Sequence, residues 1–273
     1  MRLLLKLRVA KDQVYDLKYH HKLQGFIYSL LDGTPYVKLH DKRGYKFFCF
    51  SNIFPPKGAK KEPSESMKKG ELRQMLISSP EVGLVNILNE KLEQMGVERS
   101  PVNIGEMSFV VESVKPLEPM IGRSCRLITG TPIVLRIPKE KFEKYGIVPP
   151  KDYDYVYWRK EWPFEPFVKQ LEENLFKKYR EFYGKAIEEV TLFQQLKFIK
   201  QVCNHIVVDG HETKVIGTIW AFAFDYLTEE QEKILQFGAD TGLGELNSLG
   251  FGFVHIRSGN KKVFNHRSRV KQM

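Results

Sequence analysis

The sequence predicts an α+β fold of two tandem ferredoxin-like (RRM-like) domains with a glycine-rich loop near the C-terminus. The chain has 273 residues, enough for one large domain or two small ones. Over residues 1–114 the expected order is strand, helix, strand, strand, helix, strand, which is the split βαβ arrangement. A weaker repetition of this order follows a proline-rich boundary at 116–119. We therefore expect domains at 1–117 and 118–258, and a basic tail at 259–273.

Hydrophobic periodicity places the elements of the first half. Leu3, Leu5 and Leu7 alternate with charged residues, which predicts a half-buried strand over 1–9. Its other face is basic and carries Arg2 and Lys6. The remaining elements expected here are a helix at 20–31 that stops where Gly33 would cap it, an aromatic strand at 45–50, an exposed loop at 52–69, a strand at 70–78, a helix opened by Ser79 and ended at Gly96, and extended chain at 97–114.

The second half follows the same order less cleanly. A helix at 225–238 is expected to begin at Thr228, which with Gln231 has the spacing of a capping box. The other elements expected are strands at 123–129 and 132–137, a long amphipathic helix at 163–183, hairpin strands near 190–207 and 214–224, and a last strand at 252–257.

Composition narrows the class of protein. Lys and Arg outnumber Asp and Glu by 43 to 33, an excess that suits a polyanionic partner such as nucleic acid or a membrane surface. More than half of this excess lies after residue 256, where the chain has no acidic residue. Three distant cysteines without a CxxC pair argue against a disulfide framework and a thiolate zinc site. With no signal-peptide pattern and no apolar stretch of membrane-spanning length, we expect a cytoplasmic protein without membrane contact.

The strongest local motif is a glycine-rich block near the C-terminus. It follows an expected helix and precedes an expected strand, which is the reverse of a dinucleotide-binding loop. Two interpretations stay open: successive N–H groups could form a nest for a phosphate, or the glycines could build a tight turn between packed elements. The block contributes Gly242, Gly244, Asn247, Ser248, Gly250 and Gly252 as candidate RNA-binding residues, together with Arg2 and Lys6.

A second motif combines three groups that could cleave RNA. Tyr28 lies on the first expected helix, His40 follows it, and Lys46 enters the next expected strand. RNA carries its own nucleophile in the 2′-hydroxyl. Three tasks then remain: removal of the 2′ proton, protonation of the departing 5′ oxygen, and stabilisation of the charged phosphorus centre. Histidine exchanges protons near neutral pH, lysine supplies positive charge, and tyrosine needs a lowered pKa to act as a base. By itself such a trio also occurs by chance.

Together these motifs resemble the CRISPR-associated endoribonucleases of the RAMP superfamily, in particular the archaeal type that cuts precursor CRISPR RNA within its repeats. Three stretches carry the resemblance: the strand 1–9 with the segment 19–28, the spacing of Tyr28, His40 and Lys46, and the block 238–254. The resemblance implies metal-independent cleavage without a cofactor, which leaves a 2′,3′-cyclic phosphate and a 5′-hydroxyl.

The same resemblance assigns roles and partners. It implies that Tyr28 is the general base, His40 the general acid and Lys46 the electrostatic stabiliser, although base and acid could be exchanged because the two groups can titrate together. The glycine-rich loop would shape the RNA-binding cleft. Expected partners are CRISPR repeat RNA, single-stranded or weakly structured, and as further candidates other CRISPR effector subunits or a second copy of the chain.

Two other functions fit the same sequence. One is a non-catalytic subunit that binds repeat RNA in a CRISPR ribonucleoprotein, which only turnover would distinguish from the nuclease. The other is a small-molecule-binding protein on tandem ferredoxin-like domains. The positive charge argues against the latter, because it favours a salt-sensitive interaction with nucleic acid.

Overall fold

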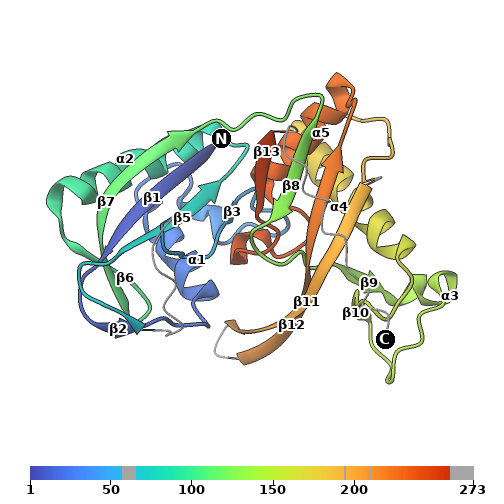
Figure 1. Cartoon of the computed structure of the whole chain (residues 1–273), viewed down its shortest axis with the longest axis horizontal. Coiled ribbons are helices and arrows are strands. Elements are labelled where there is room, and N and C mark those ends of the chain that lie inside the picture. Colours follow the sequence, from blue (N-terminus) through green and yellow to red (C-terminus); the bar gives the residue numbers. More distant parts are fainter. Residues whose placement is uncertain (57–65, 194, 209–210, 259–273) are drawn as a thin grey trace, which may run out of the picture.

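The computed structural model describes residues 1–56, 66–193, 195–208 and 211–258 and contains two α+β domains side by side (Figure 1). Each domain has its own sheet and its own buried apolar cluster. The two-domain α+β class is therefore confirmed. The division between residues 117 and 118 stays a prediction, and the basic tail at 259–273 lies outside the described residues.

The N-terminal sheet has the strand order β3-β5-β1-β7-β6, with every neighbouring pair antiparallel. Its inner face is built by Leu3, Leu5 and Leu7, all fully buried against the helices as their alternation predicts. The elements are β1 (Arg2–Val9), β2 (Gln13–Val14), α1 (His20–Ser29), the 3₁₀ turn η1 (Val37–Leu39), β3 (Cys49–Phe50), β4 (Ser66–Met67), β5 (Leu72–Ser78), α2 (Val82–Glu98), β6 (Pro101–Ile104) and β7 (Met107–Leu117).

The C-terminal sheet has the order β11-β12-β8-β13, the same ferredoxin-like topology. Trp220 and Phe167 stack at its centre with ring centroids 4.2 Å apart, and Thr228 and Gln231 form the expected capping box. The elements are β8 (Cys125–Thr129), β9 (Arg136–Pro138), η2 (Lys139–Lys141), α3 (Phe142–Tyr145), β10 (Tyr155–Tyr157), α4 (Glu165–Tyr183), β11 (Gln195–Val208), β12 (His211–Phe224), α5 (Glu229–Thr241), η3 (Asn247–Leu249) and β13 (Val254–Ser258).

Several element boundaries differ from the expected ones. The strand expected at 45–50 shrinks to Cys49–Phe50, because Phe47 adopts φ 54° and turns its ring toward Phe182 and Phe237 of the other domain. Helix α2 begins at Val82 with Glu81 as its N-cap residue; the Ser79 hydroxyl, expected to cap it, donates to the Phe47 carbonyl and accepts from the Glu81 N–H.

Two further elements also end or begin at other residues than expected. Helix α1 ends at Ser29, so Gly33 lies in the following turn with φ 71° and does not cap the helix. The strand expected at 132–137 is reduced because Ile133 and Val134 make isolated bridges to two different segments. A turn thus shortens the expected helix, and long-range bridges shorten the expected strand.

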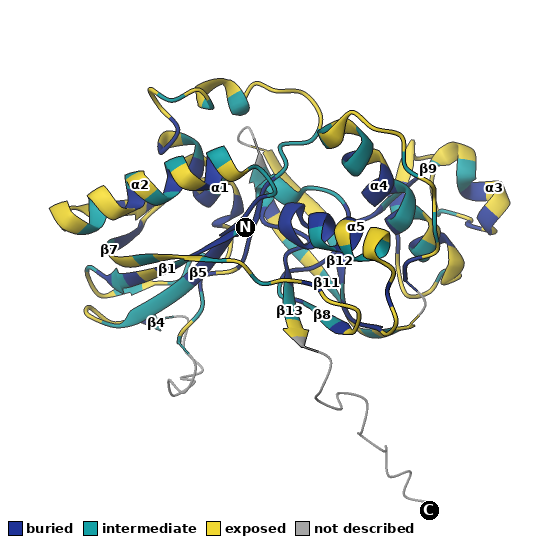
Figure 2. Cartoon of the chain, turned by 90° about the horizontal axis from the view of Figure 1, so that it is seen from above, coloured by how far each residue is buried: buried dark blue, intermediate teal, exposed yellow. Residues whose placement is uncertain are grey.

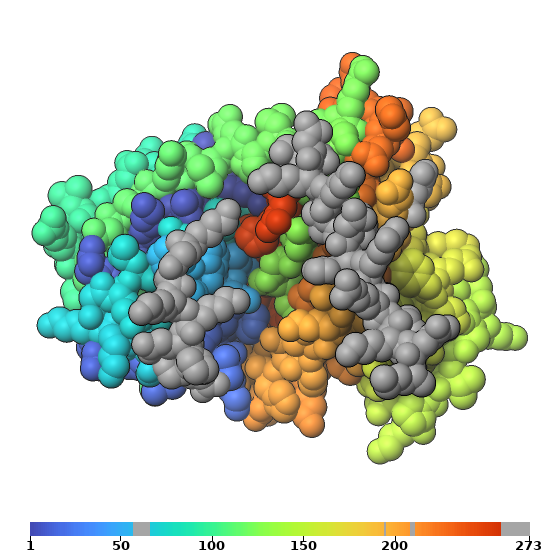
Figure 3. Space-filling model, in the orientation of Figure 1, coloured from blue at the N-terminus to red at the C-terminus, as the bar shows by residue number. Residues whose placement is uncertain are grey.

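The two domains present their layers in the same sense. In Figure 2, α1 and α2 lie on one side of the first sheet, and α4 and α5 lie on the corresponding side of the second. In the space-filling view, the early residues gather on the left and the later ones on the right, with contact between them (Figure 3). Among the described residues, no helix is long and apolar enough to cross a membrane.

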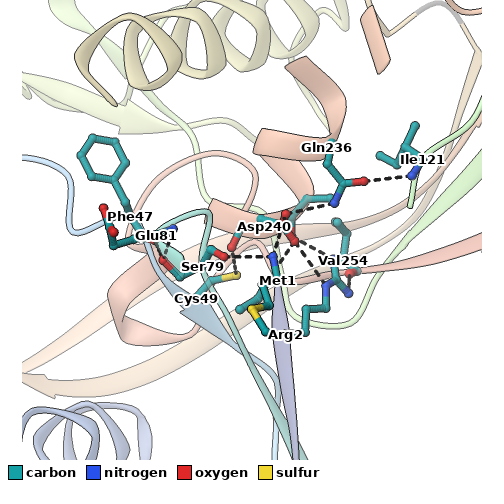
Figure 4. A network of polar contacts seen from close by, with 12 residues as sticks. Met1, Arg2, Phe47, Cys49, Ser79, Glu81, Ile121, Gln236, Asp240 and Val254 are labelled. Atoms are coloured by element: carbon teal, nitrogen blue, oxygen red, sulfur yellow. Dashed lines mark hydrogen bonds and ion pairs between the residues drawn. The ribbon is translucent and has the colours of Figure 1, made fainter. Parts of the chain in front are cut away.

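Buried charges hold the domains together at the start of β1 (Figure 4). Arg2, expected on an RNA-binding face, is only 3% exposed, and its guanidinium donates to the carbonyls of Val254 and Ala239 at 2.8 and 2.9 Å. Its Nε lies 3.8 Å from Asp240, whose carboxylate also pairs with the Met1 amine at 3.0 Å. Arg2 therefore joins β1 to α5 and β13 and is not available at the surface.

Replacement of Asp240 tests this interface. Asp240→Ala should lower the free energy of unfolding by about 3–5 kcal/mol, because it leaves the buried Arg2 charge without its carboxylate. The matched control is Glu112→Ala, which breaks the exposed pair with Arg8 and should lower the free energy of unfolding far less than Asp240→Ala. Urea unfolding followed by tryptophan fluorescence measures both. Equal losses in the two variants would contradict the role of Asp240.

Candidate active site

The structure brings Tyr28 and His40 together. Tyr28 lies near the end of α1, and the chain then folds back through η1 so that His40 follows immediately after it. The two ring centroids are 6.1 Å apart, and the Tyr28 ring rests edge-on against Phe48 at 5.9 Å. Packing against the core fixes the phenol, whereas the imidazole is about half exposed. The pair is thus open to a substrate from the side of His40.

Oxygen acceptors face both nitrogens of the His40 ring. Nδ1 lies 3.0 Å from the Val37 carbonyl, and Nε2 lies 3.0 Å from the Asp41 carboxylate. A neutral imidazole can donate through one nitrogen only, whereas the doubly protonated ring donates through both. Each ring nitrogen of His40 therefore faces an oxygen to which it can donate.

Lys46 reaches the same loop but points its ammonium at the backbone. Nζ donates to the carbonyls of Leu39 and His40, each at 2.8 Å, and to that of Lys42. Partial burial and the neighbouring Lys42 lower the pKa of Lys46. The ammonium therefore closes the loop 39–46 and holds the backbone of His40, with its three protons all directed at carbonyl oxygens.

The C-terminal domain reaches Tyr28 through the glycine-rich loop. Gln24 Nε2 donates to Ser248 Oγ at 3.1 Å and to the Tyr28 hydroxyl at 3.4 Å. Burial raises the pKa of Tyr28, and hydrogen bonds with Ser248 and Gln24 offset this only in part. In the free protein Tyr28 is therefore held as the neutral phenol.

The glycines of the loop serve close packing. Gly242, Gly244, Gly250 and Gly252 are all buried. A Cβ on Gly250 would overlap the Phe50 ring, and one on Gly252 would overlap the Leu243 carbonyl; both residues also have positive φ. The N–H groups of Gly250 and Gly252 donate to protein carbonyls. These contacts favour the tight-turn interpretation, and the half-buried Asn247 and Ser248 are the expected RNA-binding residues of the loop that remain partly accessible.

Lys178 organises this loop and was not singled out from the sequence. It is 1% exposed on α4, and its Nζ donates to the Gly242 carbonyl at 2.5 Å, the Gly244 carbonyl at 3.1 Å and Asn247 Oδ1 at 3.0 Å. Burial lowers the pKa of Lys178 to about 7. One signal was present: Lys178 follows Leu171 and Leu175 at helical spacing, so a lysine stands on the apolar face of an amphipathic helix.

Lys6 is the last of the residues that the sequence analysis named, and a pocket lies next to the site. Lys6 is exposed on β1 and stands on the face of the sheet opposite the apolar core. A pocket of about 370 Å³ adjoins the candidate catalytic residues and is lined by residues of both domains, including Lys46 and Ser248. Within the described part of the chain, no group of three or more His, Cys, Asp or Glu side chains is placed to hold a metal ion.

Comparison with known families covers nearly the whole chain. Residues 14–115 match the family described as CRISPR-associated protein Cas6, N-terminal, and residues 115–256 match CRISPR associated protein Cas6, C-terminal. A Methanocaldococcus jannaschii protein named CRISPR-associated endoribonuclease Cas6 2 is 34% identical over 93% of this chain and 99% of its own length. This chain belongs to the Cas6 family.

A second relative carries the same family name, and a solved structure shares the fold. The CRISPR-associated endoribonuclease Cas6 of Haloferax mediterranei is 29% identical over 94% of this chain and 93% of its own length. A solved structure described as a RAMP protein binding different RNA substrates superposes with a TM-score of 0.71 at 21% identity, covering 94% of this Cas6 chain and 100% of the other. At that identity the likeness establishes the shared fold, which has the two domains described above.

The lowered pKa of Lys178 predicts a pH dependence of stability. The unfolded chain keeps the ordinary lysine pKa of 10.5, whereas the folded value is about 7, so between these values the unfolded state binds one more proton. The unfolding free energy of this Cas6 protein should therefore rise with pH relative to Lys178→Met, by at most about 1.4 kcal/mol per pH unit. Urea titrations of both proteins at pH 7 and 8.5 measure the difference. A pH-independent difference would show that the amine is not neutralised by burial.

Proposed function

We propose that this Cas6 protein cleaves CRISPR repeat RNA by attack of the 2′-hydroxyl on the neighbouring phosphate, without a metal ion. The bond between phosphorus and the 5′ oxygen breaks, which leaves a 2′,3′-cyclic phosphate and a 5′-hydroxyl. The observation that carries the proposal is the pairing of Tyr28 and His40 beside Lys46. The names of its relatives, CRISPR-associated endoribonucleases, support the substrate class. Such a substrate would place the protein in the cytoplasm.

We assign the roles as the family resemblance implies. Tyr28, once its phenol has released its own proton to solvent, takes the proton of the 2′-hydroxyl as the phenolate, and His40 gives its Nε2 proton to the departing 5′ oxygen. For this step Asp41 must release Nε2, and Lys46 must exchange a backbone carbonyl for a phosphate oxygen, which offsets the charge on the five-coordinate phosphorus. The half-exposed imidazole of His40, with Nε2 already facing an acceptor, supports its role as the acid.

The first test uses the purified protein with repeat RNA in EDTA. Cleavage should continue, and mass spectrometry of the fragments should find the cyclic phosphate and the 5′-hydroxyl. A requirement for added Mg²⁺, or a 5′-phosphate on the product, would refute the mechanism. Tight binding of repeat RNA without cleavage would instead support the non-catalytic RNA-binding subunit.

Substitution of the pair tests its participation. Tyr28→Phe and His40→Ala should each slow single-turnover cleavage by about 10²- to 10⁴-fold, the contribution expected of general acid–base catalysis, with little change in RNA binding. Tyr226→Phe makes the same change at a tyrosine that is 93% exposed and should leave the rate unchanged. Wild-type rates in either site variant would remove that residue from the mechanism.

A sulfur-substituted RNA separates acid from base. A 5′-bridging thiolate leaves without being protonated, because thiols are far stronger acids than alcohols. On this RNA, His40→Ala should recover most of its lost rate, whereas Tyr28→Phe should stay slow. Recovery by Tyr28→Phe in place of His40→Ala would show that the two roles are exchanged.

A further inference from the structure

The pocket beside Tyr28, His40 and Lys46 has the size and the polar lining of a ligand site. Its volume of about 370 Å³ lies within the range of small-ligand pockets, about 300–1,000 Å³. Tyr45 and Lys46 of the N-terminal domain line one side, and Asn174 and Lys177 of α4 line the other. Because Lys46 also contacts the loop of His40, the pocket lies beside the reacting groups.

Asn174 is the polar group in this pocket that lacks a partner. It sits in the middle of α4 and is 7% exposed, and among the described residues its Oδ1 has no hydrogen-bond partner. A buried amide oxygen left unpaired destabilises a fold, so such atoms are rare in proteins. Asn174 also lines the pocket, so a ligand bound there could supply the missing donor. Asn174 is thus placed to bind a ligand with a polar edge.

The charges of the pocket favour an anionic ligand with an aromatic part. The carboxylate of Glu245 is neutralised by Arg136, which binds it through both its backbone and its side chain. Lys177 is exposed and has no ion-pair partner in the described part of the chain. The half-buried ring of Tyr45 adds a surface on which a base can stack. A nucleotide combines the negative charge, the planar ring and the hydrogen-bonding edge that these groups fit.

We propose that this pocket binds one unstacked base of the RNA, belonging to one of the two nucleotides that flank the scissile phosphate, with the Asn174 amide hydrogen-bonded to its edge. The inference rests on the proposed nuclease function. In-line attack requires the 2′ oxygen, the phosphorus and the 5′ oxygen to line up, and a stacked helical strand does not present that alignment. Holding one flanking base out of the stack would bring the backbone into line beside Tyr28 and His40, and would make the site selective for that base.

The test combines protein variants with RNAs that lack one base. Asn174→Leu removes the amide at nearly constant size, and Asn89→Leu is the matched control at a buried amide oxygen on α2 of the other domain. Each protein is assayed with intact repeat RNA and with RNAs made abasic on either side of the cut. Binding is measured on the same RNAs with a 2′-deoxy group at the attacking nucleotide, which blocks cleavage. Circular dichroism establishes that the variants fold.

We expect Asn174→Leu to slow cleavage of intact RNA about tenfold or more, the loss typical of a paired amide–base contact. The RNA that lacks the bound base should be cleaved more slowly by the wild type, by a similar factor. On that RNA the variant should cleave no more slowly than it cleaves intact RNA. If Asn174→Leu cleaves intact RNA and both abasic RNAs more slowly than the wild type by the same factor, the inference is overturned. If Asn174→Leu fails to fold, Gln170→Ala at the rim of the same helix face is compared in its place.

The binding measurement separates this inference from the nuclease proposal. If the wild type binds blocked RNA with a base preference that Asn174→Leu abolishes, but cuts no repeat RNA, the pocket is retained and the nuclease proposal fails. If the wild type cuts RNA and neither abasic position matters, the nuclease proposal is retained and the pocket fails. A protein that neither binds nor cuts repeat RNA would overturn both.

Discussion

The buried ammonium of Lys178 is the interaction on which the site depends. Removing a charged amine from water costs several kcal/mol, on the order expected for a buried ion, unless oxygen atoms replace the water. Here two loop carbonyls and the Asn247 side chain do so. Asn247 then donates to the carbonyls of Leu243 and Phe251, so that one amide ties both ends of the glycine-rich loop to a single lysine. The loop has a fixed shape before any RNA binds.

That fixed loop positions the N-terminal domain. His20 Nδ1 meets the Leu249 carbonyl at 2.7 Å, and its ring stacks on Phe251 at 4.8 Å. One turn later Gln24 binds Ser248, and one further turn later comes Tyr28. Helix α1 is thereby seated on the other domain along the face that carries the candidate base. The Arg2–Asp240 contacts fix the same domain interface at β1, so the catalytic segment is held from two directions.

The sequence predicted what local spacing and chain order determine. The buried Leu3, Leu5 and Leu7, the capping box at Thr228 and the turn built by the glycines all follow from patterns within a few residues. The resemblance implied that Tyr28 and His40 act together, and the structure gives the distance between their rings. The hydrophobic pattern placed the basic face of β1 but could not tell that Arg2 lies under α5, whereas Lys6 stays exposed.

The sequence did not indicate the residues whose role depends on distant parts of the fold. Lys178 and Phe47 contact partners far along the chain, and the Asn174 amide oxygen is buried without a partner among the described residues. A hydrophobic pattern predicts which face of an element is buried but not which residues cover that face. A lysine and an asparagine within one buried helix face are still a visible anomaly, because both residues are rarely buried. Such an anomaly marks a position where a distant oxygen, or a ligand, must complete the structure.

The contacts of the free site show which hydrogen-bond donors a phosphate would take over. The Lys46 ammonium is bound by three backbone carbonyls, and His40 Nε2 faces the Asp41 carboxylate. These oxygens occupy the donors that a phosphodiester would use, so binding exchanges one set of acceptors for another. The donor groups are already held at the site, and the substrate changes only their partner. Cleavage would then depend on how precisely the RNA backbone is aligned, and residues of both domains would set that alignment.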